Sequence, residues 1–229
     1  VIALAAFLRP YEAAICAPTG HIHVHETGAQ EATGHKIVTC EAKEGKVIPQ
    51  GVAEVCARHT DEHMVFPRLL YISQPTEIGT VYSLSELKAL RQVCDENGLL
   101  LFVDGARLGS ALTSAECDMT LRDLAALADC FYIGGTKNGL LFGEAMVIVN
   151  PALQANFRYM IKHNGGMMAK GRLCGVMFLT AMENDDYFAL ARHANAMADI
   201  VRTGMEKGGV PFCQRTTTNQ IFAILTPEQ

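Results

Sequence analysis

Short apolar runs alternate with segments of helical periodicity along the first two thirds of the chain. The helical patterns cover residues 51–58 and 118–128, and a further helix is expected to open at Ser83 and end at Gly98. Strands are predicted at residues 13–17, 36–40, 68–73, 99–103, 130–133 and 145–149. This β-α-β alternation predicts an α/β fold with a mostly parallel sheet that carries helices on both faces.

Two local signals support these boundaries. Ser83-Leu84-Ser85-Glu86 is a capping box, in which a serine and a glutamate satisfy each other's backbone amides at a helix start. The run Leu99-Leu100-Leu101-Phe102-Val103 is apolar without alternation, which is typical of a strand buried on both faces.

The pattern changes after Pro151. Three helical segments are expected at residues 152–162, 172–183 and 187–207, and the next strand-like run is 221–225. We therefore predict a large α/β domain over residues 1–170 and the start of a smaller C-terminal α+β domain over residues 171–229. The apolar run 1–8 is expected to be the end of a buried helix, and both ends of the chain are expected to continue in a longer protein.

Composition narrows the function classes. The chain of 229 residues has 19 Lys and Arg against 24 Asp and Glu, a net charge of −5, which argues against a nucleic-acid surface. Its apolar start is too short to span a bilayer, so no membrane association is expected. Eight cysteines without a C-x-x-C pair indicate a reducing, cytoplasmic location. His21, His23 and His25 would share one side of a strand or loop, but no carboxylate or cysteine completes a set, and we predict no metal site.

The candidate catalytic and binding residues come directly after the apolar runs. Ligands of parallel α/β sheets bind where the carboxyl ends of strands meet loops, and Asp104 and Lys137 each follow such a run. Taken alone, each residue has a simpler interpretation: Asp104 could cap the next helix, and Lys137 could be a solvated turn residue. Together they fit pyridoxal 5'-phosphate (PLP), a cofactor that needs an anion at its ring nitrogen and an amine at its aldehyde. The loop Gly134-Gly135-Thr136-Lys137 lacks the full phosphate-loop motif of nucleotide triphosphatases.

Four motifs in order along the chain resemble the threonine aldolases, within the β-eliminating lyase group of fold-type-I PLP enzymes. They are Gly20-His21 followed by Glu26-Thr27-Gly28-Ala29, then Val103-Asp104-Gly105-Ala106-Arg107-Leu108, then Tyr132-Ile133-Gly134-Gly135-Thr136-Lys137-Asn138-Gly139, and finally Gly165-Gly166-Met167. The ordered set spans most of the chain and is more specific than any one motif.

The resemblance implies a role for each matching residue. Lys137 would hold PLP as a Schiff base, and Asp104 would pair with the pyridine nitrogen. His21 would stack on the ring and help handle the proton of the substrate's β-hydroxyl. Arg107 would bind the substrate carboxylate through its planar fork, and Thr136 is a candidate hydrogen-bond donor to the cofactor phosphate.

The activity implied is cleavage of a β-hydroxy-α-amino acid, such as L-threonine or L-allo-threonine, to glycine and an aldehyde. β-Elimination or transamination on the same fold is the alternative reaction, and a non-catalytic relative is the alternative class. The resemblance also implies a homodimer or homotetramer. Because the family's phosphate-binding loop precedes these motifs and a second arginine follows them, we expect the 229-residue chain alone to be weakly active or inactive.

Overall fold

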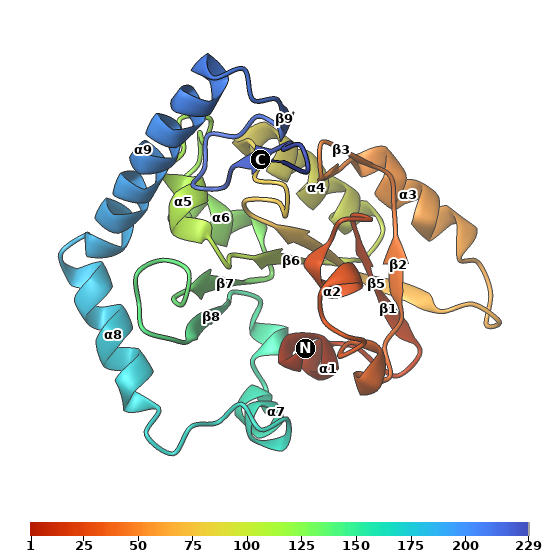
Figure 1. The fold of residues 1–229 in the computed structure, drawn as a ribbon. Helices are drawn as coiled ribbons and strands as arrows, with labels where there is room; N and C mark the ends of the chain where they lie inside the picture. Colours follow the sequence, from red (N-terminus) through yellow and green to blue (C-terminus); the bar gives the residue numbers. More distant parts are fainter. Residues whose placement is uncertain (229) are drawn as a thin grey trace.

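The structure, a computed structural model, describes residues 1–228 and is built around one six-stranded sheet. The strand order is β2-β1-β5-β6-β7-β8, and all neighbours are parallel except β7 and β8 (Figure 1). The strands are β1 (Glu12–Cys16), β2 (Ile37–Thr39), β5 (Phe66–Ser73), β6 (Leu100–Asp104), β7 (Cys130–Gly134) and β8 (Glu144–Ile148). The α/β fold with a mostly parallel sheet is therefore confirmed.

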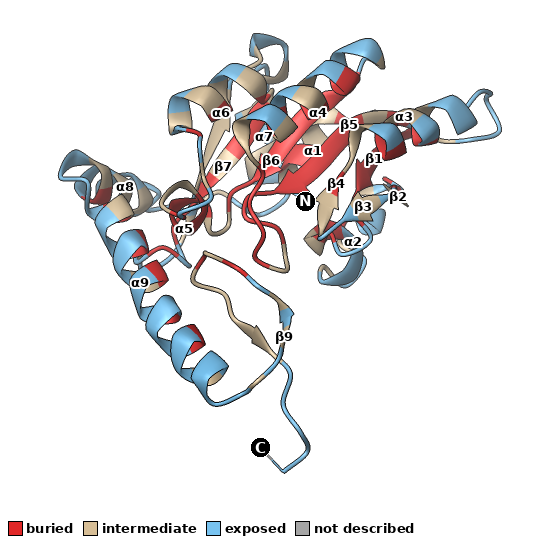
Figure 2. Cartoon of the chain, turned by 90° about the horizontal axis from the view of Figure 1, so that it is seen from above, coloured by how far each residue is buried: buried red, intermediate tan, exposed pale blue. Residues whose placement is uncertain are grey.

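Helices cover both faces of this sheet, and each face has its own apolar core. The helices are α1 (Ile2–Phe7), α2 (His21–Val24), α3 (Pro49–Arg58), α4 (Leu84–Glu96), α5 (Leu108–Leu112), α6 (Leu121–Leu127), α7 (Phe157–His163), α8 (Arg172–Glu183) and α9 (Asp186–Lys207). The larger core lies beneath α3, α4 and α6, and the smaller core lies beneath α1. Burial is concentrated on the strands between these layers (Figure 2). Among residues 1–228, no helix combines the length and apolar character needed to cross a membrane.

The capping signals in the sequence correspond to real helix ends. Ser83 accepts a hydrogen bond from the Glu86 amide while the Glu86 carboxylate accepts from the Ser83 amide, which is the expected capping box. Thr120 and Asp123 form the same arrangement at the start of α6. Gly98 follows α4 with a φ of +65°, a conformation that glycine adopts without steric cost.

Three local expectations were wrong. His21–Val24 forms a single helical turn instead of a strand or loop, so the three histidines do not share one side as they would in a strand, although the rings of His21 and His25 lie 5.2 Å apart. Four residues are too few for helical periodicity to be visible in a sequence. The segment expected to be helical from residue 152 begins with a 3₁₀ turn at Pro151–Leu153, and α7 starts only at Phe157.

The third correction concerns the end of the chain. A short strand, β9 (Phe212–Gln214), pairs in antiparallel fashion with β10 (Phe222–Ala223), whereas the sequence indicated only the second. Another two-stranded ladder joins β3 (Ala42–Lys43) and β4 (Lys46–Val47), and a 3₁₀ turn covers Glu31–Thr33. The sheet ends before α8 and α9, but Ala181 and Tyr187 from these helices belong to the larger core, and the domain boundary near residue 170 stays a prediction.

Candidate active site

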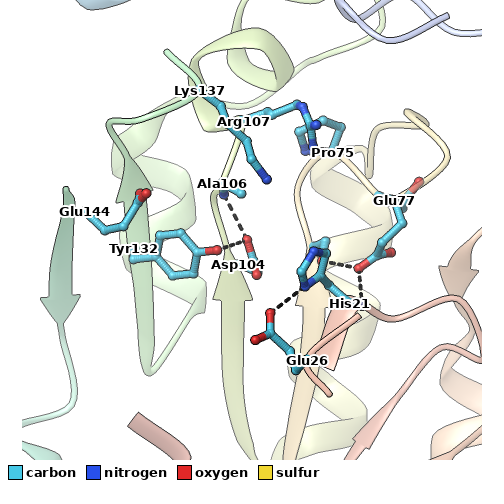
Figure 3. A pocket seen from close by; sticks show the side chains of 12 residues that line it. His21, Glu26, Pro75, Glu77, Asp104, Ala106, Arg107, Tyr132, Lys137 and Glu144 are labelled. Atoms are coloured by element: carbon cyan, nitrogen blue, oxygen red, sulfur yellow. Dashed lines mark hydrogen bonds and ion pairs between the residues drawn. The ribbon is translucent and has the colours of Figure 1, made fainter. Parts of the chain in front are cut away.

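Four of the five sequence-predicted site residues line one pocket at the carboxyl end of the sheet. Asp104 is the last residue of β6, His21 begins α2, and Arg107 and Lys137 lie in the loops after β6 and β7. The pocket has a volume of about 200 Å³. Figure 3 shows Lys137 and Arg107 entering it from loops at the edge toward which the Asp104 side chain points. The parallel register explains the convergence, because strands that run in the same direction end at the same edge.

The buried carboxylate of Asp104 accepts from three neutral hydrogen-bond donors among residues 1–228. The hydroxyl of Tyr71 donates to its Oδ2, the hydroxyl of Tyr132 donates to its Oδ1, and the amide of Ala106 donates to the same Oδ1 over 2.9 Å. Its exposed fraction is 9%. Within residues 1–228 Asp104 forms no ion pair. Buried charges are normally paired, so this environment suits a ligand that brings a positive charge.

The two tyrosines that bind Asp104 were missed by the sequence analysis. Tyr71 lies in β5 and Tyr132 in β7, the strands on either side of β6. Both fall inside apolar runs, where a tyrosine is indistinguishable from a packing residue. Burial, followed by the charge of Asp104, raises the pKa of both phenols above the usual value, so each hydroxyl keeps its proton and remains a donor.

Three hydrogen bonds from two side chains hold the loop that carries Lys137. The buried Asn138 side chain donates to the carbonyls of Ala106 and Gly134 over 2.9 and 2.8 Å. The Tyr187 hydroxyl, on α9, donates to the Gly134 carbonyl over 3.0 Å. Lys137 itself is exposed, and within residues 1–228 its amine forms no ion pair. The fold thus holds the backbone of this loop and leaves the amine available.

Glu144 is a further pocket residue that the sequence did not indicate. The chain turns back after β7, and the antiparallel β8 starts with Glu144 at the same edge of the sheet. Its carboxylate accepts from the Gly135 amide over 3.0 Å. Burial raises the pKa of Glu144, against the opposing effect of hydrogen bonds from Gly135 and Thr136. Thr136 therefore contacts Glu144 and is not among the residues lining the pocket, so its proposed phosphate contact stays a prediction.

His21 is held by two glutamates. Its Nδ1 lies 2.7 Å from Glu26 Oε1, and its backbone amide donates to Glu77 Oε1 over 2.8 Å (Figure 3). The Ser73 hydroxyl also donates to Glu77 Oε1, over 2.6 Å. In the tautomer whose Nδ1–H donates this hydrogen bond to Glu26, the lone pair of the ring is on Nε2. The sequence held no local signal for Glu77, because it is 56 residues from His21.

The loops of this site approach too closely for side chains at two glycines. A Cβ on Gly105 would lie 2.0 Å from the Tyr132 carbonyl oxygen, and one on Gly134 would lie 2.3 Å from the Ala106 carbonyl oxygen. We expect Gly105→Ala to lower the free energy of unfolding by about 2–3 kcal/mol or more, because backbone must move. Gly204→Ala on α9, where nothing lies within 4 Å, should instead raise it by about 0.5–1 kcal/mol.

Chemical denaturation of the two variants measures this difference directly. A Gly105→Ala variant as stable as the wild type would contradict the close approach of the two loops.

The fold defines a class, that of the fold-type-I PLP enzymes. Cystalysin from Treponema denticola, whose structure contains pyridoxal 5'-phosphate, matches over 94% of this chain with a TM-score of 0.69 at 17% identity, which shows the shared fold. The family model of the β-eliminating lyases matches residues 1–227. The chain belongs to the β-eliminating lyase family.

Two similar proteins are threonine aldolases. The low specificity L-threonine aldolase of Pseudomonas aeruginosa is 34% identical over 202 residues, 87% of this chain. The solved structure of a threonine aldolase from Leishmania major matches 99% of this chain with a TM-score of 0.97 and 47% identity. The chain spans 58% of the length of the Pseudomonas relative and 66% of the Leishmania chain.

The pocket residues fit the cofactor that the family implies. PLP offers a ring nitrogen that can carry a positive charge, and Asp104 is a buried carboxylate with neutral donors only. PLP also offers an aldehyde, and Lys137 is an amine without an ion-pair partner among residues 1–228. Within these same residues, no group of three or more His, Cys, Asp or Glu is arranged to hold a metal ion.

Proposed function

We propose that the protein is a PLP-dependent aldolase that cleaves a β-hydroxy-α-amino acid, such as L-threonine or L-allo-threonine, to glycine and an aldehyde. The main support is the convergence in one pocket of Asp104, a buried carboxylate without an ion pair among the described residues 1–228, and the amine of Lys137. Membership in the β-eliminating lyase family and the names of the relatives agree with this reaction.

Each residue of the pocket has a part in this proposal. Lys137 supplies the amine that anchors the cofactor, and Asp104 holds the proton of its ring nitrogen. When bound, PLP supplies an electron-accepting ring for the charge left on the substrate's Cα. Arg107 binds the substrate carboxylate, for which a planar guanidinium with two parallel donors is suited.

His21 handles the proton whose removal starts the cleavage. Its Nε2 takes the proton of the β-hydroxyl, the Cα–Cβ bond breaks and the β-carbon leaves as an aldehyde. Glu26 accepts a hydrogen bond from Nδ1 over 2.7 Å, so it stabilises the positive charge that forms on the imidazole of His21. Protonation of Cα then gives glycine.

The test is made on the full-length protein. PLP should produce a visible absorption band, and borohydride reduction followed by peptide mapping should place the cofactor on Lys137. Incubation with L-threonine and L-allo-threonine should then release acetaldehyde and glycine. Ammonia with a keto acid would instead identify β-elimination, and a keto acid formed without free ammonia would identify transamination, in which the amino group passes to an acceptor. Failure to bind PLP would reject the proposal.

Oligomeric state and compartment are separate proposals. We propose a homodimer or homotetramer, supported by exposed apolar side chains along α8, namely Leu173, Val176 and Leu179. A cytoplasmic location is supported by all eight cysteines being unpaired. Light scattering after size exclusion measures the first, and fractionation of cells measures the second.

A further inference from the structure

We propose that Tyr71 and Tyr132 are positioning residues that act as a clamp on Asp104 and make the pocket selective for a ring nitrogen that carries a proton. This inference rests on the proposed function. The two residues form what we call the tyrosine clamp: the hydroxyls of Tyr71 and Tyr132 both donate to the Asp104 carboxylate. The clamp would act on the cofactor through Asp104.

The clamp is rigid because its rings form a row across three strands. The Tyr71 ring stacks on Phe102 with centroids 5.6 Å apart and planes 11° apart. The Phe102 ring in turn meets Tyr132 at 6.3 Å with a tilt of 55°. Tyr71 and Phe102 are paired residues in the β5–β6 ladder. The two hydroxyls therefore approach the carboxylate from opposite neighbouring strands, and this fixes its rotation.

Fixing Asp104 matters because two cationic side chains share its pocket. Lys137 and Arg107 both line the cavity, and a mobile carboxylate would pair with one of them. In the structure it pairs with neither. By binding both carboxylate oxygens of Asp104, the clamp keeps the Lys137 amine available for the cofactor and the Arg107 guanidinium available for the substrate.

The clamp orients the Asp104 carboxylate without adding a positive charge, because both of its donors are neutral hydroxyls. Burial and the charge of Asp104 keep both phenols protonated, so neither can accept the proton that a ligand brings. Neither Lys137 nor Arg107 pairs with Asp104 in the structure, so a ligand whose ring nitrogen carries a proton can supply the positive charge that balances Asp104.

The experiment compares two ligands in two variants of the full-length protein. Tyr71→Phe and Tyr132→Phe each remove one hydroxyl and keep the ring. The ligands are PLP and its deaza analogue, in which carbon replaces the ring nitrogen. We expect each variant to bind PLP about tenfold more weakly, the loss of one hydrogen bond to a charged group, and the deaza analogue with less than about twofold change.

Tyr82→Phe is the matched control. Tyr82 is a buried tyrosine outside the pocket, and its hydroxyl accepts from the Val47 amide. Its replacement should destabilise the fold and leave both ligand affinities unchanged.

Each outcome decides the inference. Equal weakening of PLP and the deaza analogue would mean that the tyrosines serve packing alone, and unchanged PLP affinity would mean that the clamp has no effect on Asp104; either result overturns the proposal. Wild-type protein that binds no PLP on Lys137 would overturn the proposed function, and the role of the clamp with it. Selective loss of PLP affinity in both variants, with wild-type PLP trapped on Lys137, supports the clamp.

Discussion

Replacing Lys137 with alanine is expected to remove covalent attachment of PLP and to lower turnover of L-threonine strongly, because Lys137 supplies the amine that anchors the cofactor. Among the residues that line the described pocket, Lys137 is the lysine, and it lies on the loop after β7. Arg107 also lines the pocket, but it cannot form a Schiff base with the PLP aldehyde because its guanidinium does not lose a proton. Borohydride trapping followed by mass spectrometry, together with steady-state kinetics, measures both effects.

The matched control for this variant is Lys88→Ala. Lys88 is an exposed lysine on α4, outside the pocket, so its loss should change neither attachment nor turnover. Lys137→Ala should also fold normally, because its side chain is exposed and packs into no core. A Lys137→Ala protein that still carries PLP on another residue and turns over at the wild-type rate would refute the assignment.

Asp104→Asn is expected to weaken PLP binding by about 2–5 kcal/mol, roughly 30- to 5,000-fold, because the ring nitrogen loses its buried counter-charge. The fold should tolerate this change within about 1 kcal/mol. The retained Oδ1 can still accept from Tyr132 and Ala106, and the new amide can donate to the Tyr71 hydroxyl, which rotates to accept. Fluorescence titration with PLP and thermal unfolding of the apo-protein separate the two effects.

Asp129→Asn gives the opposite pattern and serves as the control. Asp129 accepts from the Leu101 amide and the Arg91 guanidinium on Oδ2, and from the Asn150 amide on Oδ1, each over 2.8 Å. In either orientation of an asparagine side chain, its NH₂ group would face one of these donors and could not accept from it. We therefore expect the free energy of unfolding to fall by about 2–4 kcal/mol. PLP affinity should be unchanged. If Asp104→Asn and Asp129→Asn behaved alike, Asp104 would be a structural residue.

The local patterns of the sequence predicted most elements of the sheet and its helices. Apolar runs mark β1, β5, β6, β7 and β8 to within a few residues, and capping residues mark the start of α4. Such features depend on neighbours within one or two turns of chain, so they are visible in the sequence. Elements of two to four residues, such as α2 and β9, are below the length at which periodicity can be detected, and they form because tertiary contacts hold them.

The candidate site divides in the same way. The sequence was enough to predict Asp104 and Lys137 at the edge where parallel strands end, because position after a buried strand is a local property. The partners of these residues were not predictable from it. Tyr71 and Tyr132 are 33 and 28 residues from Asp104, and Glu144 reaches the pocket only because β8 runs antiparallel.

The local sequence thus predicts the chemical groups that this protein can offer to a cofactor. They are a carboxylate, an amine, an imidazole and a guanidinium at one edge of a sheet. How those groups behave was decided by the tertiary structure. Strand order sets Tyr71 and Tyr132 on either side of Asp104 and leaves that buried charge without an ion pair among residues 1–228. The environment of a buried charge depends on neighbours across strands, and no local pattern encodes strand order.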